Sequence, residues 1–208
     1  MRRPPIDERN RSSRVALGGA SAAFVAALVL ERVAETNFAI HMVQHMLLIV
    51  VVAPLLVVGT KPNWRVPMVA SWLLFAVVMW VTHLTSIYDS ALDHALVHAL
   101  EHLVFIAASY VFWVPVIVGD RAYPLRLGYL ALSLPQQAFL ALAIYSSTSP
   151  IYAHYPKLDD QKAGAIVMWV GGDMAFIVAI ALVIGAWMRA ERMSDDEDVE
   201  RHRAEEQR

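Results

Sequence analysis

The 208-residue sequence contains no cysteine. That absence excludes a disulfide framework, a thiolate metal site and a thiol redox centre. A bound metal must therefore take its ligands from His, Met, Asp or Glu. Charge is also scarce, because only 17% of the residues are charged, against about 25% in an average soluble domain.

Hydrophobic residues make up 58% of the chain and the mean hydropathy is +0.48. They lie in long runs, whereas the charges gather at the two ends. Most runs approach the roughly 20 residues that a spanning helix needs. We therefore expect an all-α, polytopic transmembrane helical bundle with about six spans, at residues 15–30, 40–58, 66–82, 98–118, 125–145 and 163–188.

The chain divides into a basic segment at 1–14, a transmembrane helical domain at 15–188 and a charged tail at 189–208. The start carries no evident cleavable signal peptide, so the first run should remain as an anchor. The tail should be a solvated, frayed helix or disordered. Tyr152 and Tyr155, in the loop before the last span, are expected to be interfacial anchors.

Basic residues predict the orientation of the spans. Of the 17 Lys and Arg residues, only Arg32, Lys157 and Lys162 fall on one side of the predicted membrane. Both termini should therefore be cytoplasmic, in a multi-pass protein of the bacterial cytoplasmic membrane. With this orientation every histidine except His202 lies at the extracytoplasmic face; these are His41, His45, His83, His94, His98, His102 and His154.

Two histidine stripes enter the membrane from that face. "HMVQH" places His41 and His45 four residues apart, and "HALVHALEH" repeats the spacing from His94 through His98 to His102. Residues at i and i+4 share one face of a helix. Ionisable groups in spans usually face the bundle interior and mark function. The two stripes can therefore converge on one ion, with His83 nearby.

The residue types favour a transition metal. Neutral imidazole suits copper, zinc, iron and nickel. Thioethers favour Cu(I), which makes Met42, Met46 and Met168 candidate ligands beside the histidines. Carboxylates can orient imidazole N–H groups from outside the ligand set, and the candidates for this role are Glu101, Asp93 and Asp160.

Several other interpretations remain open. The histidines can be hydrogen-bond partners between helices, and the methionines can be packing residues. "HALEH" matches the H-x-x-E-H pattern, which would make a membrane zinc hydrolase of His98, Glu101 and His102. Facing histidines can also ligate haem, and a partner protein that binds no metal is a further possibility.

The ordered motifs resemble those of the CtaG-type cytochrome c oxidase assembly factors, which are bacterial multi-span membrane proteins. The resemblance covers residues 38–188 and rests on "HMVQHMLLIVVVAPLLVVG", "VTHLTSIYDSALDHALVHALEHLVFIAASYVFWVPVI" and "DDQKAGAIVMWVGGD". It implies a non-enzymatic role in maturing the copper centres of haem–copper oxidases. The family's motifs correspond here to the six histidines from His41 to His102 and to Asp160, Gln161, Met168 and Trp169.

The resemblance and the residues suggest the same hypothesis. Oxidase copper is inserted near the extracytoplasmic half of an integral membrane subunit, and a donor needs exchangeable ligands at that depth. Histidine and methionine hold Cu(I) less tightly than thiolates, which suits hand-over. The expected partners are the oxidase catalytic subunit, a copper-donating chaperone and the lipid bilayer, with no nucleic acid.

Overall fold

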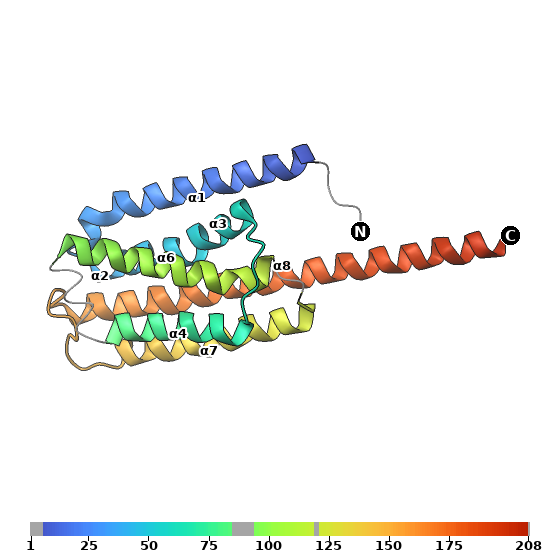
Figure 1. The fold of residues 1–208 in the computed structure, drawn as a ribbon. Helices are drawn as coiled ribbons and strands as arrows, with labels where there is room; N and C mark the ends of the chain where they lie inside the picture. Colours follow the sequence, from blue (N-terminus) through green and yellow to red (C-terminus); the bar gives the residue numbers. More distant parts are fainter. Residues whose placement is uncertain (1–5, 85–93, 119–120, 208) are drawn as a thin grey trace.

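The chain forms an all-helical bundle in a computed structural model that describes residues 6–84, 94–118 and 121–207. Its helices run alternately up and down, side by side (Figure 1). In chain order they are α1 (Ile6–Ala34), α2 (Phe38–Met46), the π-helix η1 (Leu47–Val52), α3 (Ala53–Thr60), α4 (Met68–Leu84), α6 (Ala95–Ile117), α7 (Tyr123–Tyr145) and α8 (Leu158–Glu206).

The predicted helical membrane bundle is confirmed. Among the described residues, five helices are long and apolar enough to cross a membrane: Asn10–Ala34, Phe38–Thr60, Ala95–Ile117, Tyr123–Tyr145 and α8. α4 is shorter, at 17 residues, or about 25 Å at 1.5 Å per residue. It nevertheless packs within the bundle beside α6 and α7 (Figure 1).

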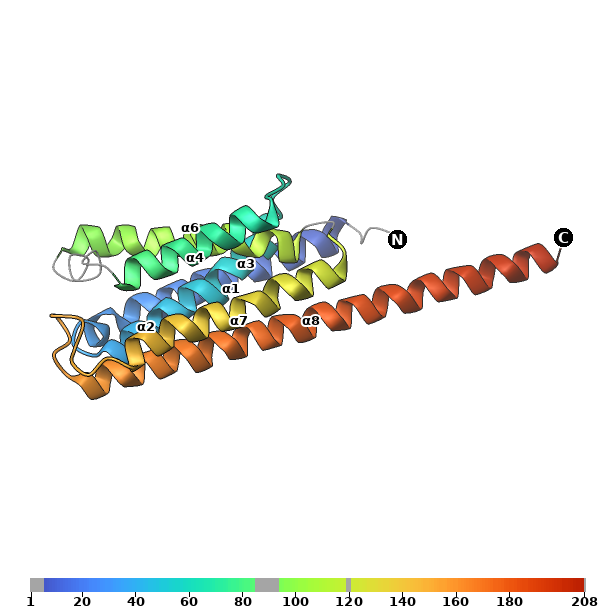
Figure 2. The same cartoon turned by 90° about the horizontal axis from the view of Figure 1, so that it is seen from below.

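The sequence predicts that the charged tail is either a frayed helix or disordered. The tail is helical through Glu206, as part of α8. α8 projects well past the other helices, as Figure 2 shows. The beginning of α1 and the far end of α8 lie at the same end of the bundle (Figure 1). The connections 35–37 and 146–157, together with the beginning of α6, lie at the other end.

A π-helical turn lies within the second span. In that register the carbonyl of Ile49 would pair with the backbone N–H of residue 54, but Pro54 has no such donor. The indole of Trp113 donates to this carbonyl instead, at 3.0 Å. Because every polar group in a lipid-embedded bundle needs an internal partner, this bond fixes α6 against the second span.

The beginning of α2 is held by α8. Asp160 accepts hydrogen bonds from the backbone N–H groups of Phe38 (2.7 Å) and Ala39 (3.2 Å). Asn37 caps the same turn by accepting from Ile40 at 2.9 Å. A carboxylate at a helix N-terminus satisfies orphan donors and complements the helix dipole. Asp160 thereby sets the position of α2 and of the histidines that follow.

Gly164 allows α2 and α8 to pack closely, and replacing it should destabilise the bundle. A Cβ at Gly164 would overlap the ring of Phe38 and lie 3.2 Å from Cγ of Met42. We expect Gly164→Ala to lower the free energy of unfolding by about 1–3 kcal/mol, measured by denaturant titration in detergent micelles. Gly128→Ala is the control, since its Cβ meets nothing within 4 Å. Equal stability of the two variants would contradict this account.

The cytoplasmic location of both termini stays a prediction, which cysteine labelling can test because the chain has no cysteine of its own. Ser149, in the 146–157 connection, and Ser194, on the α8 extension, are both exposed. In intact cells a membrane-impermeant maleimide should label Ser149→Cys, and it should label Ser194→Cys only after permeabilisation. The reverse pattern would invert the proposed orientation.

Candidate metal centre

Four histidines from two helices meet near one end of the bundle. α2 contributes His41 and His45, and α6 contributes His98 and His102. One potential ligand atom from each residue lies within 4.8 Å of those of the other three. The ring centroids of His41 and His98 are 5.2 Å apart, and those of His45 and His102 are 5.3 Å apart. The two i, i+4 stripes therefore converge as the spacing predicts.

The cluster is buried, and its surroundings are aromatic. His41 is 1% exposed and His45 is 0% exposed. The ring of Phe105 packs against His45 at 4.6 Å between centroids. His83 of α4 lies at the edge of the group, 5.9 Å from His45 between ring centroids. Its Nδ1 donates to the carbonyl of Met79 at 2.8 Å, which leaves Nε2 as the nitrogen with a lone pair.

The hydrogen bonds of Tyr155 fix the tautomer of His41. The Tyr155 hydroxyl donates its one hydrogen to the carbonyl of Ala34 at 2.6 Å. Burial, followed by the charge of Asp160, raises the pKa of Tyr155 above its ordinary value, so the hydroxyl keeps this hydrogen. Its oxygen must then accept from Nδ1 of His41, 3.0 Å away. The Nε2 of His41 is left with a lone pair that faces the cluster.

Glu31 fixes His98 in the same way. Nδ1 of His98 lies 2.8 Å from Oε1 of this carboxylate, and Nε2 of His98 is buried with no hydrogen-bond partner among the described residues. Metal-binding histidines usually donate their second ring N–H to a carboxylate or carbonyl, which aims the other nitrogen at the metal. His41 and His98 both have this arrangement.

His41 and His45 touch directly. Their Nε2 atoms are 2.8 Å apart. Because Nε2 of His41 carries no hydrogen in this tautomer, the Nε2–H of His45 donates to it. Bonds of about 2.0–2.1 Å to a tetrahedral ion would place ligand nitrogens roughly 3.3 Å apart. Ligation therefore requires a small separation of these rings and a shift of the His45 proton to Nδ1, which is buried without a partner among the described residues.

One acidic and two aromatic contributors escaped the sequence analysis. Glu31 falls one residue beyond the expected first span, whereas α1 extends to Ala34 and carries it into the bundle. Its only signal was an acidic residue at the end of an apolar run. Tyr152 and Tyr155 are 3% and 2% exposed, so the expectation that they anchor the chain at the membrane interface is wrong. Tyr152 donates to the carbonyl of His83 at 2.8 Å.

His94 and three methionines are the other expected ligands, and metal binding by the methionines stays a prediction. His94 is exposed at the beginning of α6. Met42 and Met46 face Gly164 and Gly171 of α8, and Met168 is buried in the hydrophobic core. The methionines thus contribute to core packing, principally between α2 and α8.

The expected carboxylates have different surroundings. Asp160 binds the N-terminus of α2 rather than an imidazole. Glu101 is buried beside His102, and neither of its oxygens accepts a hydrogen bond from the described residues. Asp93 lies outside the described residues.

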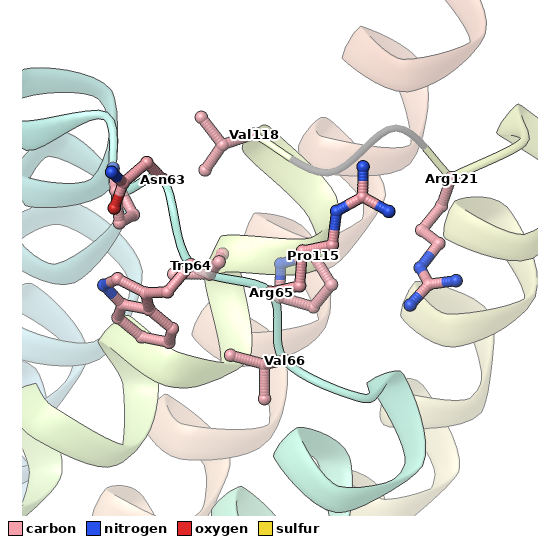
Figure 3. A pocket seen from close by; sticks show the side chains of 9 residues that line it. Asn63, Trp64, Arg65, Val66, Pro115, Val118 and Arg121 are labelled. Atoms are coloured by element: carbon pink, nitrogen blue, oxygen red, sulfur yellow. The ribbon is translucent and has the colours of Figure 1, made fainter.

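A pocket at the opposite end of the bundle is separate from this cluster. It has a volume of about 210 Å³, and Arg65 and Arg121 flank Pro115 along its wall (Figure 3). Its lining comes from the loop before α4 and from the region where α6 ends and α7 begins. None of the four clustered histidines takes part.

Comparisons with known proteins identify the family. A family model described as cytochrome c oxidase caa3 assembly factor matches residues 2–63 and 64–190. No solved structure matches the chain.

Curated relatives come from mycobacteria, and all are named as uncharacterized. A Mycobacterium leprae protein is 24% identical over 136 residues, covering 58% of this chain and 21% of that protein. Proteins of Mycobacterium bovis and Mycobacterium tuberculosis are each 21% identical over 221 residues, covering 84% of this chain and 33% of theirs. The chain thus spans a third or less of the length of these relatives.

Removing the Tyr155 hydroxyl should weaken metal binding. Tyr155→Phe takes away the acceptor for Nδ1 of His41, so the preferred tautomer is lost and the affinity should fall about 10–100-fold. Competition titration with a chromophoric chelator measures this change. Tyr152→Phe is the matched control, because that hydroxyl is equally buried but bonds to the backbone of His83. Equal affinities for both variants would rule out the orienting role.

Proposed function

The chain belongs to the cytochrome c oxidase caa3 assembly factor family, and from this membership and the four-histidine cluster we propose that it binds copper and passes it to the oxidase. His41, His45, His98 and His102 hold the ion. The cluster lies at the extracytoplasmic side of the membrane, and the catalytic subunit of the haem–copper oxidase receives the copper. The protein acts as a metal-binding chaperone of the bacterial cell inner membrane and not as an enzyme.

The observation that carries the proposal is the orientation of the imidazoles. Tyr155 and Glu31 each accept from a Nδ1–H group, and this turns the Nε2 atoms of His41 and His98 towards the same small volume. The Nε2 of His98 is buried without a hydrogen-bond partner among the described residues. A buried nitrogen in this state is costly, and a metal ion would satisfy it.

Copper is the metal that the donor set and the family favour together. Neutral imidazoles bind copper well, and these four rings lie among aromatic and apolar side chains. The chain has no thiolate that would hold Cu(I) more tightly, so transfer to an acceptor is not opposed by the strongest class of ligand. His83, whose ring lies 5.9 Å from that of His45, is a further candidate donor during transfer.

The depth of the cluster suits hand-over within the membrane. His41 follows the beginning of α2 at Phe38 by three residues, and His98 follows the beginning of α6 at Ala95 by three. Three residues correspond to about 4.5 Å along a helix axis. The ion is therefore held about one turn below the membrane surface, where an oxidase subunit can approach from the side and a copper-donating chaperone from the aqueous phase.

The two other metal-based candidates fit less well. A catalytic zinc site keeps a position open for water, whereas four converging imidazoles fill a tetrahedral ion. A haem bound between two helices needs room for the porphyrin between facing histidines, but the ring centroids are only 5.2 Å apart for His41 and His98 and 5.3 Å apart for His45 and His102.

Metal analysis of purified variants tests the copper site. Protein from copper-replete membranes should contain copper, and each of His41→Ala, His45→Ala, His98→Ala and His102→Ala should lower the copper content at least severalfold. His94→Ala serves as the control because His94 is exposed and outside the cluster. Unchanged copper content in all four variants would refute the proposal. The same variants should lower the copper content of the oxidase in cells.

Glu101→Gln separates copper delivery from hydrolysis. Under the present proposal this variant keeps its copper and supports oxidase assembly, because Glu101 is not among the ligands. A zinc hydrolase that used Glu101 as general base would lose almost all turnover. A Soret absorption band in the purified protein would identify haem instead.

A further inference from the structure

We infer that Glu31 is the residue at which the copper ion first meets this chain, at the edge where α1 and α6 come together. This inference rests on the proposed copper function and adds an access point to it. Glu31 lies in the last turn but one of α1, and its carboxylate contacts His98, the second histidine of α6. We call this pair the α1–α6 access point.

Exposure decreases stepwise from Glu31 into the cluster. The side chain of Glu31 is 32% exposed and that of His98 is 12% exposed, whereas His41 and His45 are 1% and 0% exposed as whole residues. An ion that arrives from water therefore meets the carboxylate first and His98 second. The Nε2 of His98 already belongs to the group of four nitrogen ligands.

Other sides of the cluster are covered by the described residues. The 146–157 connection closes it through Tyr155, bound to Ala34 and His41, and through Tyr152, bound to His83. Phe105 packs against His45 and His83 from α6. On the side of α8, Met42 meets Gly164. At the α1–α6 access point, by contrast, the charged side chain of Glu31 is partly exposed.

Contacts to both oxygens fix the position of the Glu31 carboxylate. Gln44, which is fully buried, donates to Oε2 of Glu31 at 2.5 Å and to the carbonyl of Ala27 at 3.0 Å. These bonds hold one carboxylate oxygen while the other contacts His98. A fixed anion at the membrane boundary attracts cations, and such focusing raises association rates about 10–10³-fold.

The test separates the rate of loading from the capacity of the site. Glu31→Gln keeps an oxygen that accepts from His98 but removes the negative charge. Glu35→Gln is the matched control: it makes the same charge change one turn further along, at an exposed position. Each micelle-solubilised full-length variant is mixed with Cu(I) as its cationic acetonitrile complex, and the Cu(I) not yet bound is trapped by bicinchoninate at set times and read by absorbance.

We expect Glu31→Gln to load at least about tenfold more slowly than the unmodified protein, because the negative charge that attracts the ion is gone although the amide oxygen can still accept from His98. Glu35→Gln should load within twofold of the unmodified rate, and Glu31→Asp, which retains the charge, should recover most of it. Added salt should slow the unmodified protein far more than Glu31→Gln, because screening weakens an attraction that the variant lacks.

Two results would overturn the inference while leaving the copper site intact. They are an unchanged loading rate in Glu31→Gln and equal slowing in Glu35→Gln. If the unmodified protein binds no copper, the proposed function fails instead. Equilibrium copper content and loading rate thus distinguish the two failures.

Discussion

The site depends on the hydrogen bonds that orient imidazoles inside an apolar bundle. A neutral imidazole has one N–H and one lone pair, and in lipid neither can be left to water. Tyr155 and Glu31 take the N–H groups of His41 and His98. The Nε2 atoms of these two rings are then directed inwards, where that of His41 meets His45 and that of His98 has no partner among the described residues. The candidate metal site follows from this common orientation of the rings.

The rest of the bundle positions the four rings that share this space. Asp160 and Gly164 of α8 fix the beginning of α2 by a helix cap and by close packing. The Trp113 indole binds the carbonyl that Pro54 leaves unpaired, and so holds α6 against the second span. These contacts explain why α2 and α6, which run in the same direction and begin at the same end of the bundle, present their histidines at the same depth. Oxidase assembly, the role of the family, would use a bundle that keeps such ligands buried but close to the membrane surface.

Sequence patterns predicted much of this architecture. Long apolar runs are sufficient to predict membrane helices, because chain length and hydropathy alone decide whether a helix can span. The i, i+4 spacing of His41 with His45, and of His98 with His102, placed each pair on one helical face. Their convergence followed from ionisable side chains avoiding lipid. The ends of the helices are less predictable from the sequence. The apolar run predicts that the first span ends at residue 30, yet α1 continues to Ala34.

What the sequence determined by itself, therefore, was the set of spans and the two histidine stripes, since both depend on local periodicity and composition. Tertiary structure decided which partners those histidines have. Glu31 and Tyr155 carry no spacing relationship to the motifs, and Tyr155 lies 114 residues from His41 in the chain. Met42 and Met46 share their helix with the histidines but turn towards α8. Contacts of this kind arise only when separate helices pack, because the orientation of a buried side chain depends on its neighbours in space.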